Sequence, residues 1–323
     1  MADSGDGDLD LVIRTPCINS IPMSKGRYSV YLKLENLQIP GSFKQRGISH
    51  FCKKAVKNGA TRFVCASGGN AGLAVAYTAH CLKVPATIIL PTTTPEFVAN
   101  RIRDMGAIVE VHGDVWDESN EYAQTLTKDS GCVHVHPSDH PDVWEGHSPM
   151  ILETKEQMPC QPDVVVTSVG GGGLLTGVVQ GMWKAGWNDV PVVAMETEGA
   201  ESYKKAVEAG KLVTLPAITS VAKCLGTLTV CAASLEKSTQ HKIYPALVTD
   251  EQAVDACIKF ADDHRMLVQP ACGASLAAVY SEVIPRLQKE GKLGVVNSVL
   301  VIVCGGSAVT IDRLQQKFGL QVV

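Results

Sequence analysis

The feature that most constrains the fold of this 323-residue chain is a regular alternation of short apolar runs with longer amphipathic segments. Runs rich in β-branched residues predict strands, and segments whose apolar residues recur every three or four positions predict helices. Strands that alternate with helices form parallel sheets through crossover connections, so an α/β protein is predicted. The predicted strands are 31–35, 62–66, 86–90, 108–112, 133–136, 163–169, 192–196, 244–248 and 296–304, and the predicted helices are 48–56, 71–82, 95–105, 116–129, 174–185, 199–209, 250–263, 273–290 and 310–318.

The length of the chain predicts two lobes, because single hydrophobic cores stop growing at about 250–300 residues. Two sets of about four predicted strands, one set in each half of the chain, indicate one sheet per lobe. The predicted fold class is therefore α/β, with two open, mostly parallel twisted sheets flanked by helices. A cleft between the lobes is the expected ligand site.

Composition and charge exclude several classes of protein. The net charge is −4 and no block of Lys or Arg occurs, which argues against nucleic acid as the main partner. The apolar run 299–304 is far shorter than the ~20 residues of a membrane span. The first ten residues are acidic and lack the apolar stretch of a secretory signal, and the 11 cysteines include no C-x-x-C pair. We therefore expect a reduced, cytoplasmic protein without a nucleic-acid or membrane partner.

Glycine gathers where predicted strands end. The strand 163–169 leads directly into four consecutive glycines, 170–173, and a predicted helix follows. Residues without Cβ let backbone N–H groups turn inward beside a helix N-terminus, which makes an anion cradle suited to phosphate. The patterns G-x-G-x-x-G and G-x-x-x-x-G-K-[ST] both fail here, so a single phosphomonoester such as that of pyridoxal phosphate remains. The alternative is a tight strand–helix turn without a ligand.

Two further glycine clusters follow predicted strands. Residues 67–70, Ser-Gly-Gly-Asn, offer a hydroxyl and an amide that suit a carboxylate as well as a phosphate. A helix simply capped by Asn70 is the alternative. Residues 304–307, Cys-Gly-Gly-Ser, end the last apolar strand. Ligands of open α/β sheets bind beyond the carboxyl ends of strands, which is the place of all three clusters.

One lysine fits the needs of a pyridoxal enzyme, which binds the cofactor through an amine. Lys44 lies in the segment 40–47, Pro-Gly-Ser-Phe-Lys-Gln-Arg-Gly, between a predicted strand and a predicted helix. Burial beside Phe43 would lower the pKa of this lysine and make the neutral amine available. From local chemistry alone, a solvated loop lysine stays the alternative.

Six segments in this order resemble the motifs of one family. They are G-S-F-K-x-R-G at 41–47, S-G-G-N-A-G at 67–72, G-G-G-G-L-L at 170–175, A-M-E-T at 194–197, P-A-C-G at 270–273 and V-C-G-G at 303–306. From about residue 15 onward the chain resembles the fold type II pyridoxal-phosphate enzymes, and most closely the animal L-serine dehydratases and serine dehydratase-like proteins. The resemblance implies a tryptophan synthase β-like architecture. A large cofactor-binding domain would comprise 1–37 and 141–323, a small domain would comprise 38–140, and the cofactor would lie between them.

The resemblance also implies a role for each matching residue. Lys44 would carry pyridoxal 5'-phosphate and move the α-proton, Asn70 would bind the 3-hydroxyl, and Cys304 would face the pyridine nitrogen. The residues implied to bind the cofactor are Phe43, Lys44, Asn70, Gly170, Gly171, Gly172, Gly173, Leu174 and Cys304. Those implied to bind the substrate are Ser67, Gly68, Asn70, Ala71 and Ser138. A monovalent cation such as potassium would be held by Glu196 and by the backbone carbonyls of Gly170, Ala200 and Leu225.

The activity implied is β-elimination from L-serine or L-threonine, which gives pyruvate or 2-oxobutyrate and ammonia. Lys44 would take the α-proton, and the β-hydroxyl would leave with a proton from the cofactor phosphate. The thiol of Cys304 is a weak partner for the ring nitrogen, so the cofactor would be a mild electron sink that favours prompt elimination. The family setting is a cytoplasmic homodimer of amino-acid metabolism and gluconeogenesis.

Several alternatives stay open. Ser138 stands where the close relatives have Phe, and Gln269 where they have Glu, so a more polar substrate such as 3-hydroxyaspartate competes with unchanged serine chemistry. A serine or aspartate racemase is the nearest rival. Serine racemases place a catalytic serine at the position of Gly68, and glycine cannot transfer a proton, which favours the lyase. An amino-acid-binding regulator with weak catalysis is the alternative of another class.

Overall fold

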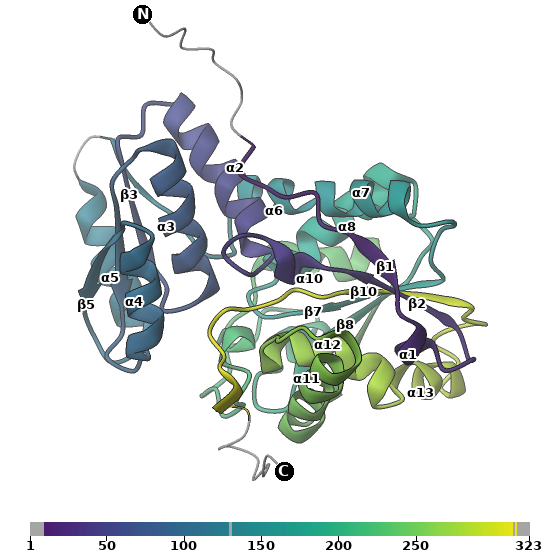
Figure 1. The fold of residues 1–323 in the computed structure, drawn as a ribbon. Helices are drawn as coiled ribbons and strands as arrows, with labels where there is room; N and C mark the ends of the chain where they lie inside the picture. Colours follow the sequence, from purple (N-terminus) through teal and green to yellow (C-terminus); the bar gives the residue numbers. More distant parts are fainter. Residues whose placement is uncertain (1–9, 129–130, 313, 315–323) are drawn as a thin grey trace, which may run out of the picture.

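The computed structural model describes residues 10–128, 131–312 and 314, and each of its two lobes is built around one sheet (Figure 1). Most of the central strands are buried along their whole length, as parallel strands between two helix layers must be. The strands are β1 (Cys17–Asn19), β2 (Ser29–Lys33), β3 (Arg62–Ala66), β4 (Ala86–Leu90), β5 (Ile108–Val111), β6 (Cys132–His134), β7 (Val164–Ser168), β8 (Val192–Thr197), β9 (Ile243–Val248) and β10 (Ser298–Ile302).

The smaller lobe holds a four-stranded parallel sheet in the order β5-β4-β3-β6. Its helices are α2 (Lys44–Lys57), α3 (Asn70–Leu82), α4 (Glu96–Asp104) and α5 (Trp116–Thr125), with the turn η2 (Leu126–Lys128). Apolar residues of α2, α3 and α4 cover one face of the sheet, and Ala123 of α5 packs on the other. The chain runs outward from β3 to β5 and then returns to place β6 on the opposite side of β3. This reversal of strand order marks the usual ligand-binding place of an open α/β sheet.

The larger lobe holds a six-stranded sheet in the order β1-β2-β10-β7-β8-β9, in which only β1 is antiparallel to its neighbour. Helices α7 and α8 lie over one face of this sheet, and α11 to α13 lie over the other (Figure 1). The remaining elements of the chain are α1 (Ile21–Ser24), η1 (Glu35–Leu37), α6 (Pro141–His147), α7 (Pro149–Gln157), α8 (Gly173–Ala185), α9 (Ser202–Ala209), η3 (Lys223–Leu225), α10 (Ala232–Gln240), α11 (Asp250–His264), α12 (Pro270–Tyr280) and α13 (Val283–Lys289).

The predicted fold class is confirmed, and each of the nine predicted strands is present with its ends moved by no more than two residues. The expectation of about four strands per sheet is wrong for the larger lobe, where β1 is too short to show a pattern. The single helix predicted at 273–290 is also wrong. The backbone breaks it at Glu282, whose φ of 60° lies in the left-handed region, so α12 and α13 are separate.

Other differences concern the helices. The sequence analysis did not predict α6, α7 or α10, the first two of which begin with proline and the last of which is largely polar. The helix predicted at 310–318 falls mostly outside the described residues. The last residue of the helix predicted at 116–129 also falls outside them. Within the described part of the chain, no helix is both long and apolar enough to cross a membrane.

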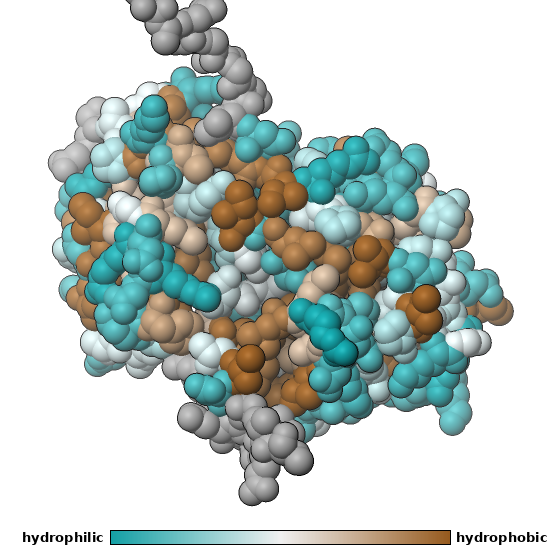
Figure 2. Space-filling model, in the orientation of Figure 1, coloured by the Kyte–Doolittle hydropathy of each residue, from teal (hydrophilic) through white to brown (hydrophobic). Residues whose placement is uncertain are grey.

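A group of apolar side chains remains exposed near the start of the described chain. Ile13 exchanges hydrogen bonds between its backbone and the side chain of Gln38, at 3.0 and 2.8 Å, so it lies beside the segment that carries Leu37 and Ile39. The exposed fractions of Ile13, Leu37 and Ile39 are 40%, 40% and 56%. Apolar side chains gather on the face of the molecule shown in Figure 2.

Candidate functional site

Segments that follow four strands meet at the junction of the two lobes. Residues 67–70 after β3 and 137–138 after β6 come from the smaller lobe, and residues 170–173 after β7 and 304–307 after β10 come from the larger one. Ser307 N donates to Asn70 Oδ1 at 3.0 Å, and Gly171 lies against Ser138. The three glycine clusters predicted at strand ends therefore lie together, at the place where α/β proteins bind ligands.

Lys44 is the first residue of α2, and its amine reaches this junction. Lys44 Nζ donates a hydrogen bond to Pro137 O and lies 5.2 Å from the ring centroid of Phe43. No carboxylate of the described residues forms an ion pair with it. Burial lowers the pKa of Lys44 to about 8, with the nearby thiol of Cys224 opposing this shift. The structure thus presents an amine that is far more often neutral near pH 8 than a surface lysine.

The four glycines 170–173 are required by close packing. A Cβ at Gly170 would come within 2.9 Å of Cys224 O, and one at Gly171 or Gly173 would overlap Ser138. Gly172 has a φ of 88° and immediately precedes α8. Leu174 is buried in the first turn of that helix. Backbone N–H groups at a helix N-terminus, approached closely because no Cβ intervenes, suit a phosphate group.

The cluster after β3 begins α3. Asn70 is the first residue of this helix, and its side-chain oxygen is fixed by the backbone of Ser307. Ser67 N donates to Ile89 O of β4 at 3.1 Å, and Ala71 is buried. Gly68 lies under Thr94, whose hydroxyl oxygen a Cβ on Gly68 would overlap. The first amides of α3 are therefore placed to receive an anion beside the junction.

Cys304 is buried just beyond β10. Its sulfur lies 3.4 Å from Ser168 Oγ. A hydrogen bond with the Cys272 thiol lowers the pKa of Cys304, while burial opposes that shift. Phe43 N donates to Cys304 O at 3.1 Å, so the thiol and the Lys44 segment are tied together. The group at this position is thus a thiol in a network of weak donors.

Glu196, at the carboxyl end of β8, is fully buried. Its two oxygens accept hydrogen bonds from Tyr203 N at 2.9 Å and Lys204 N at 2.8 Å, at the start of α9. Burial raises the pKa of Glu196 to about 8, and these hydrogen bonds oppose the shift. Gly170 packs against Leu225, since a Cβ on Gly170 would lie 3.1 Å from Leu225 Cα. Ala200, four residues after Glu196, is also buried.

The sequence analysis missed Cys224 and Thr94 as residues of the junction. Cys224 Sγ lies 3.8 Å from Asn70 Nδ2 and donates to Gln269 Oε1 at 3.6 Å, so it joins the smaller lobe to the larger one. Burial raises the pKa of this thiol. Cys224 lies in the three-residue helix η3, which is too short to give a sequence pattern, and Thr94 is one of three consecutive threonines, so neither position carries a local signal in the sequence.

A second cation, the buried Arg46, lies two residues after Lys44 on the same helix. The Arg46 guanidinium donates to both oxygens of Glu35, at 2.6 and 2.9 Å, and to both oxygens of Glu153, at 2.8 and 2.7 Å. Lys33 also donates to Glu153, at 2.6 Å. Burial would lower the pKa of Arg46, but the charges and hydrogen bonds of the two glutamates raise it above its ordinary value. Arg46 therefore belongs to a structural charge network.

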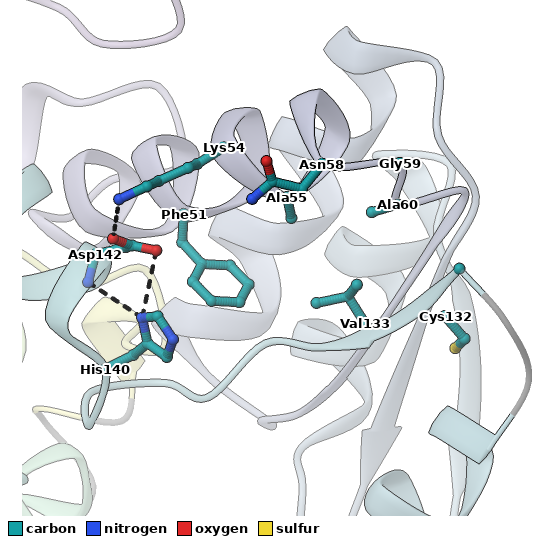
Figure 3. Close-up of a pocket in the computed structure, with 11 residues that line it drawn as sticks. Phe51, Lys54, Ala55, Asn58, Gly59, Ala60, Cys132, Val133, His140 and Asp142 are labelled. Carbon is teal, nitrogen blue, oxygen red and sulfur yellow. Dashed lines mark hydrogen bonds and ion pairs between the residues drawn. The ribbon is translucent and has the colours of Figure 1, made fainter.

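A separate cavity of about 480 Å³ lies at the far end of α2 (Figure 3). Its lining includes Phe51, Lys54, His140 and Asp142, and Lys54 pairs with Asp142. Lys54 is ten residues beyond Lys44, which is about 15 Å along a helix. His50 and Glu145 lie close enough to Asp142 to share a metal ion with it, but the Asp142 carboxylate already forms an ion pair with Lys54. This cavity is distinct from the junction, and we assign it no function.

Comparison with known proteins gives a consistent result. The sequence profile described as pyridoxal-phosphate dependent enzyme matches residues 9–305. The chain is 51% identical over 308 residues to the Homo sapiens protein named L-serine dehydratase/L-threonine deaminase, with 94% of each chain covered. It is 51% identical over 304 residues to the Rattus norvegicus protein named serine dehydratase-like, with 94% of this chain and 92% of the other covered. A solved L-serine ammonia-lyase from Rhizomucor miehei is similar, with a TM-score of 0.88, 36% identity, and coverage of 95% of this chain and 98% of the other. The resemblance predicted from the motifs is confirmed.

Proposed function

Because the chain belongs to the family of pyridoxal-phosphate dependent enzymes, we propose that it is an ammonia-lyase acting on L-serine and L-threonine. The products are pyruvate or 2-oxobutyrate, and ammonia. Relatives that are 51% identical over 94% of this chain are named for serine and threonine chemistry, which supports this substrate class. The observation that carries the proposal is the amine of Lys44, which donates to Pro137 O beside the glycine run and pairs with no carboxylate of the described residues.

The residues at the junction fit pyridoxal phosphate in three respects. The glycine run lies at the N-terminus of α8 and carries no side chains, which lets the backbone N–H groups there approach a phosphate closely. Lys44 supplies an amine whose pKa burial lowers to about 8. Cys304 supplies a buried thiol on a segment that is hydrogen-bonded to the backbone of Phe43. When bound, the cofactor supplies an electron sink for the charge that develops at the substrate α-carbon.

The chain's own residues bind, orient and move protons in this proposal. Lys44 Nζ takes the α-proton, a task suited to an amine with a pKa near the working pH. The amides and hydroxyl of residues 67–71, at the start of α3, hold the substrate carboxylate. The run 170–174 holds the phosphate, and Asn70 orients the ring. Cys304 offers the ring nitrogen a weak partner, which favours elimination over longer-lived charge at the α-carbon.

A panel of substrates tests the proposal and separates its alternatives. The purified chain is loaded with pyridoxal phosphate, and keto-acid formation is measured with L-serine, L-threonine and 3-hydroxyaspartate. We expect keto acid from serine and threonine. A clear preference for 3-hydroxyaspartate would instead indicate that Ser138 and Gln269 adapt the site to a more polar substrate. Cofactor binding without any keto acid would favour a regulator.

We further propose that potassium binds at Glu196 with the carbonyls of Gly170, Ala200 and Leu225. A buried carboxyl whose pKa is raised to about 8 is costly to ionise, and its ionised form gains most from a cation. Stability from potassium should therefore grow as the pH rises through about 8. We expect a larger rise in melting temperature with KCl than with tetramethylammonium chloride at pH 9, and a smaller difference at pH 6.5. Glu196→Gln should lose this pH dependence, and an equal potassium effect at both pH values would contradict the assignment.

A cytoplasmic homodimer is also proposed. Ile13, Leu37 and Ile39 form an exposed apolar group that a second copy of the chain would cover. All 11 cysteines are free, which suits a reducing compartment. We expect light scattering to give twice the mass of 34.4 kDa, and Ile39→Lys to weaken the dimer.

The limits of the two domains follow the sheets in this proposal. The smaller domain would span 38–140, because α2 and every strand of the four-stranded sheet fall within those residues. The larger domain would comprise 1–37 and 141–323. Limited proteolysis would test these limits, with early cleavage expected near residues 38 and 140.

A further inference from the structure

The three threonines that follow β4 have different environments. Thr92 Oγ1 donates to Asp114 Oδ1 at 2.7 Å, and Thr93 Oγ1 donates to Asp114 O at 3.4 Å. The hydroxyl of Thr94 has no hydrogen-bond partner among the residues that the structure describes. It rests instead on Gly68, where a Cβ would overlap Thr94 Oγ1 and come within 2.9 Å of Thr94 Cγ2. This hydroxyl therefore fills the space that a side chain at position 68 would take.

Thr94 and Lys44 flank the end of β3 from opposite sides. β3 lies between β4 and β6 in the sheet, and Thr94 follows β4. Lys44 Nζ is bonded to Pro137 O, which follows β6. Two strand spacings, about 10 Å in total, separate the strands that position the two groups. A carbon held at the end of β3 would therefore have one of the two groups on each side.

We propose that Thr94 is a second proton-transfer residue, which gives the chain a slow serine racemase activity beside its lyase activity. The inference rests on the proposed function, because it concerns the same α-carbon. Lys44 would take the α-proton as the C–H bond breaks, and the cofactor, when bound, would supply the sink for the electron pair left at the α-carbon. A new C–H bond would form on the opposite side with the proton of the Thr94 hydroxyl, water would restore the Thr94 proton, and the hydroxide left by that water would take the proton held by Lys44. One proton leaves and one arrives, so no oxidant or reductant is required.

The glycine at position 68 then has a definite role. The absence of a side chain at 68 was expected to leave the second side of the α-carbon without a catalyst, but the geometry supplies a hydroxyl from position 94. The φ of Gly68 lies outside the left-handed region, so the backbone does not itself require glycine there. The space that Thr94 occupies is what requires glycine at position 68. Racemisation should be the minor reaction, because a threonine hydroxyl is a weak acid and loss of the β-hydroxyl competes with it.

The partition between the two products tests the inference. The chain loaded with pyridoxal phosphate is incubated with L-serine, and D-serine and pyruvate are measured in the same sample by chiral chromatography. We expect the ratio of D-serine to pyruvate to fall at least about ten-fold in Thr94→Val, which keeps the shape of the side chain without the hydroxyl. Thr94→Ser should retain the ratio within about three-fold. Thr93→Val is the matched control and should leave the ratio unchanged.

Two results would overturn the inference: pyruvate without D-serine from the parent chain, or an unchanged ratio in Thr94→Val. Absence of both products would overturn the proposed function as well. A stability cycle on the cofactor-free chain tests the geometry independently. Gly68→Ala should lower the urea midpoint, and Thr94→Ala in the same chain should reverse most of that loss, since the added methyl then has space. Strict additivity of the two changes would show that Thr94 does not lie on Gly68.

Discussion

Two cations on the same helix, the half-buried Lys44 and the buried Arg46, have opposite surroundings. Arg46 meets four carboxylate oxygens of Glu35 and Glu153, and its pKa is raised. Lys44 meets one backbone carbonyl, and burial lowers its pKa to about 8. The two residues are separated by a single position, so the difference comes from what the rest of the fold places against each face of α2.

The comparison separates a structural charge from a reactive one. A buried charge that is fully paired is fixed in its ionised form and contributes to a specific arrangement of elements. A buried amine left without a carboxylate is destabilised as a cation, which makes it a base and a nucleophile near neutral pH. The perturbed group lies at strand ends beside the glycine run, where a functional site is expected. Each of the following predictions changes one side of this contrast.

The largest effect is expected on activity when Lys44 is removed. Lys44→Ala should reduce keto-acid formation from L-serine by at least about 1,000-fold, because it removes both the cofactor's amine and the base. Enzyme-coupled detection of pyruvate measures this loss. Arg46→Lys is the control for a changed cation on the same helix. This variant should still bind the cofactor and keep its visible absorbance. Turnover in Lys44→Ala close to that of the parent would contradict the assignment.

Removal of Arg46 should affect stability instead. Arg46→Met leaves Glu35, which is fully buried, without its partner and should lower the free energy of unfolding by about 3–5 kcal/mol. Urea unfolding of the cofactor-free chain measures the change. Lys44→Met is the matched variant and should stay within about 1 kcal/mol of the parent, since no carboxylate loses a partner there. Similar losses in both variants would show that the two cations do not differ in the way proposed.

A smaller effect is expected from pH. Burial lowers the pKa of Lys44, so its neutral, nucleophilic form is scarce below about pH 8 and dominant above it. The rate at which the cofactor-free chain captures pyridoxal phosphate should rise with pH and level off above about 8. Stopped-flow absorbance over pH 6.5–10 gives the profile. A rate that still rises steeply beyond pH 10, as for an ordinary lysine, would show that Lys44 is solvated.

Much of the fold was predictable from the sequence because its signals are local. Apolar runs identified nine strands, and the glycine run after β7 was placed at the start of a helix as predicted. The role of Lys44 was not predictable from local chemistry, which favoured a solvated loop lysine, and it depended on resemblance to a family. What favours the assignment in the structure is a long-range fact, the packing of Lys44 against Pro137 across 93 positions of sequence.

The residues that sequence reasoning missed are also defined by long-range pairs. Thr94 matters only because Gly68 lies beneath it, and Cys224 only because Asn70 and Gln269 lie beside it. The partners of Arg46 are 11 and 107 positions away. No periodicity or turn pattern encodes such pairs, so they emerge only once the chain has folded.

The central claim is that Lys44 is the amine that carries the cofactor, and borohydride reduction tests it most directly. Reduction fixes pyridoxal phosphate to the lysine that holds it, and peptide mass spectrometry then locates the label. We predict a single modified peptide carrying the label on Lys44, with no label in Lys44→Ala treated in the same way. Label on a different lysine, or an equal yield in Lys44→Ala, would contradict the account.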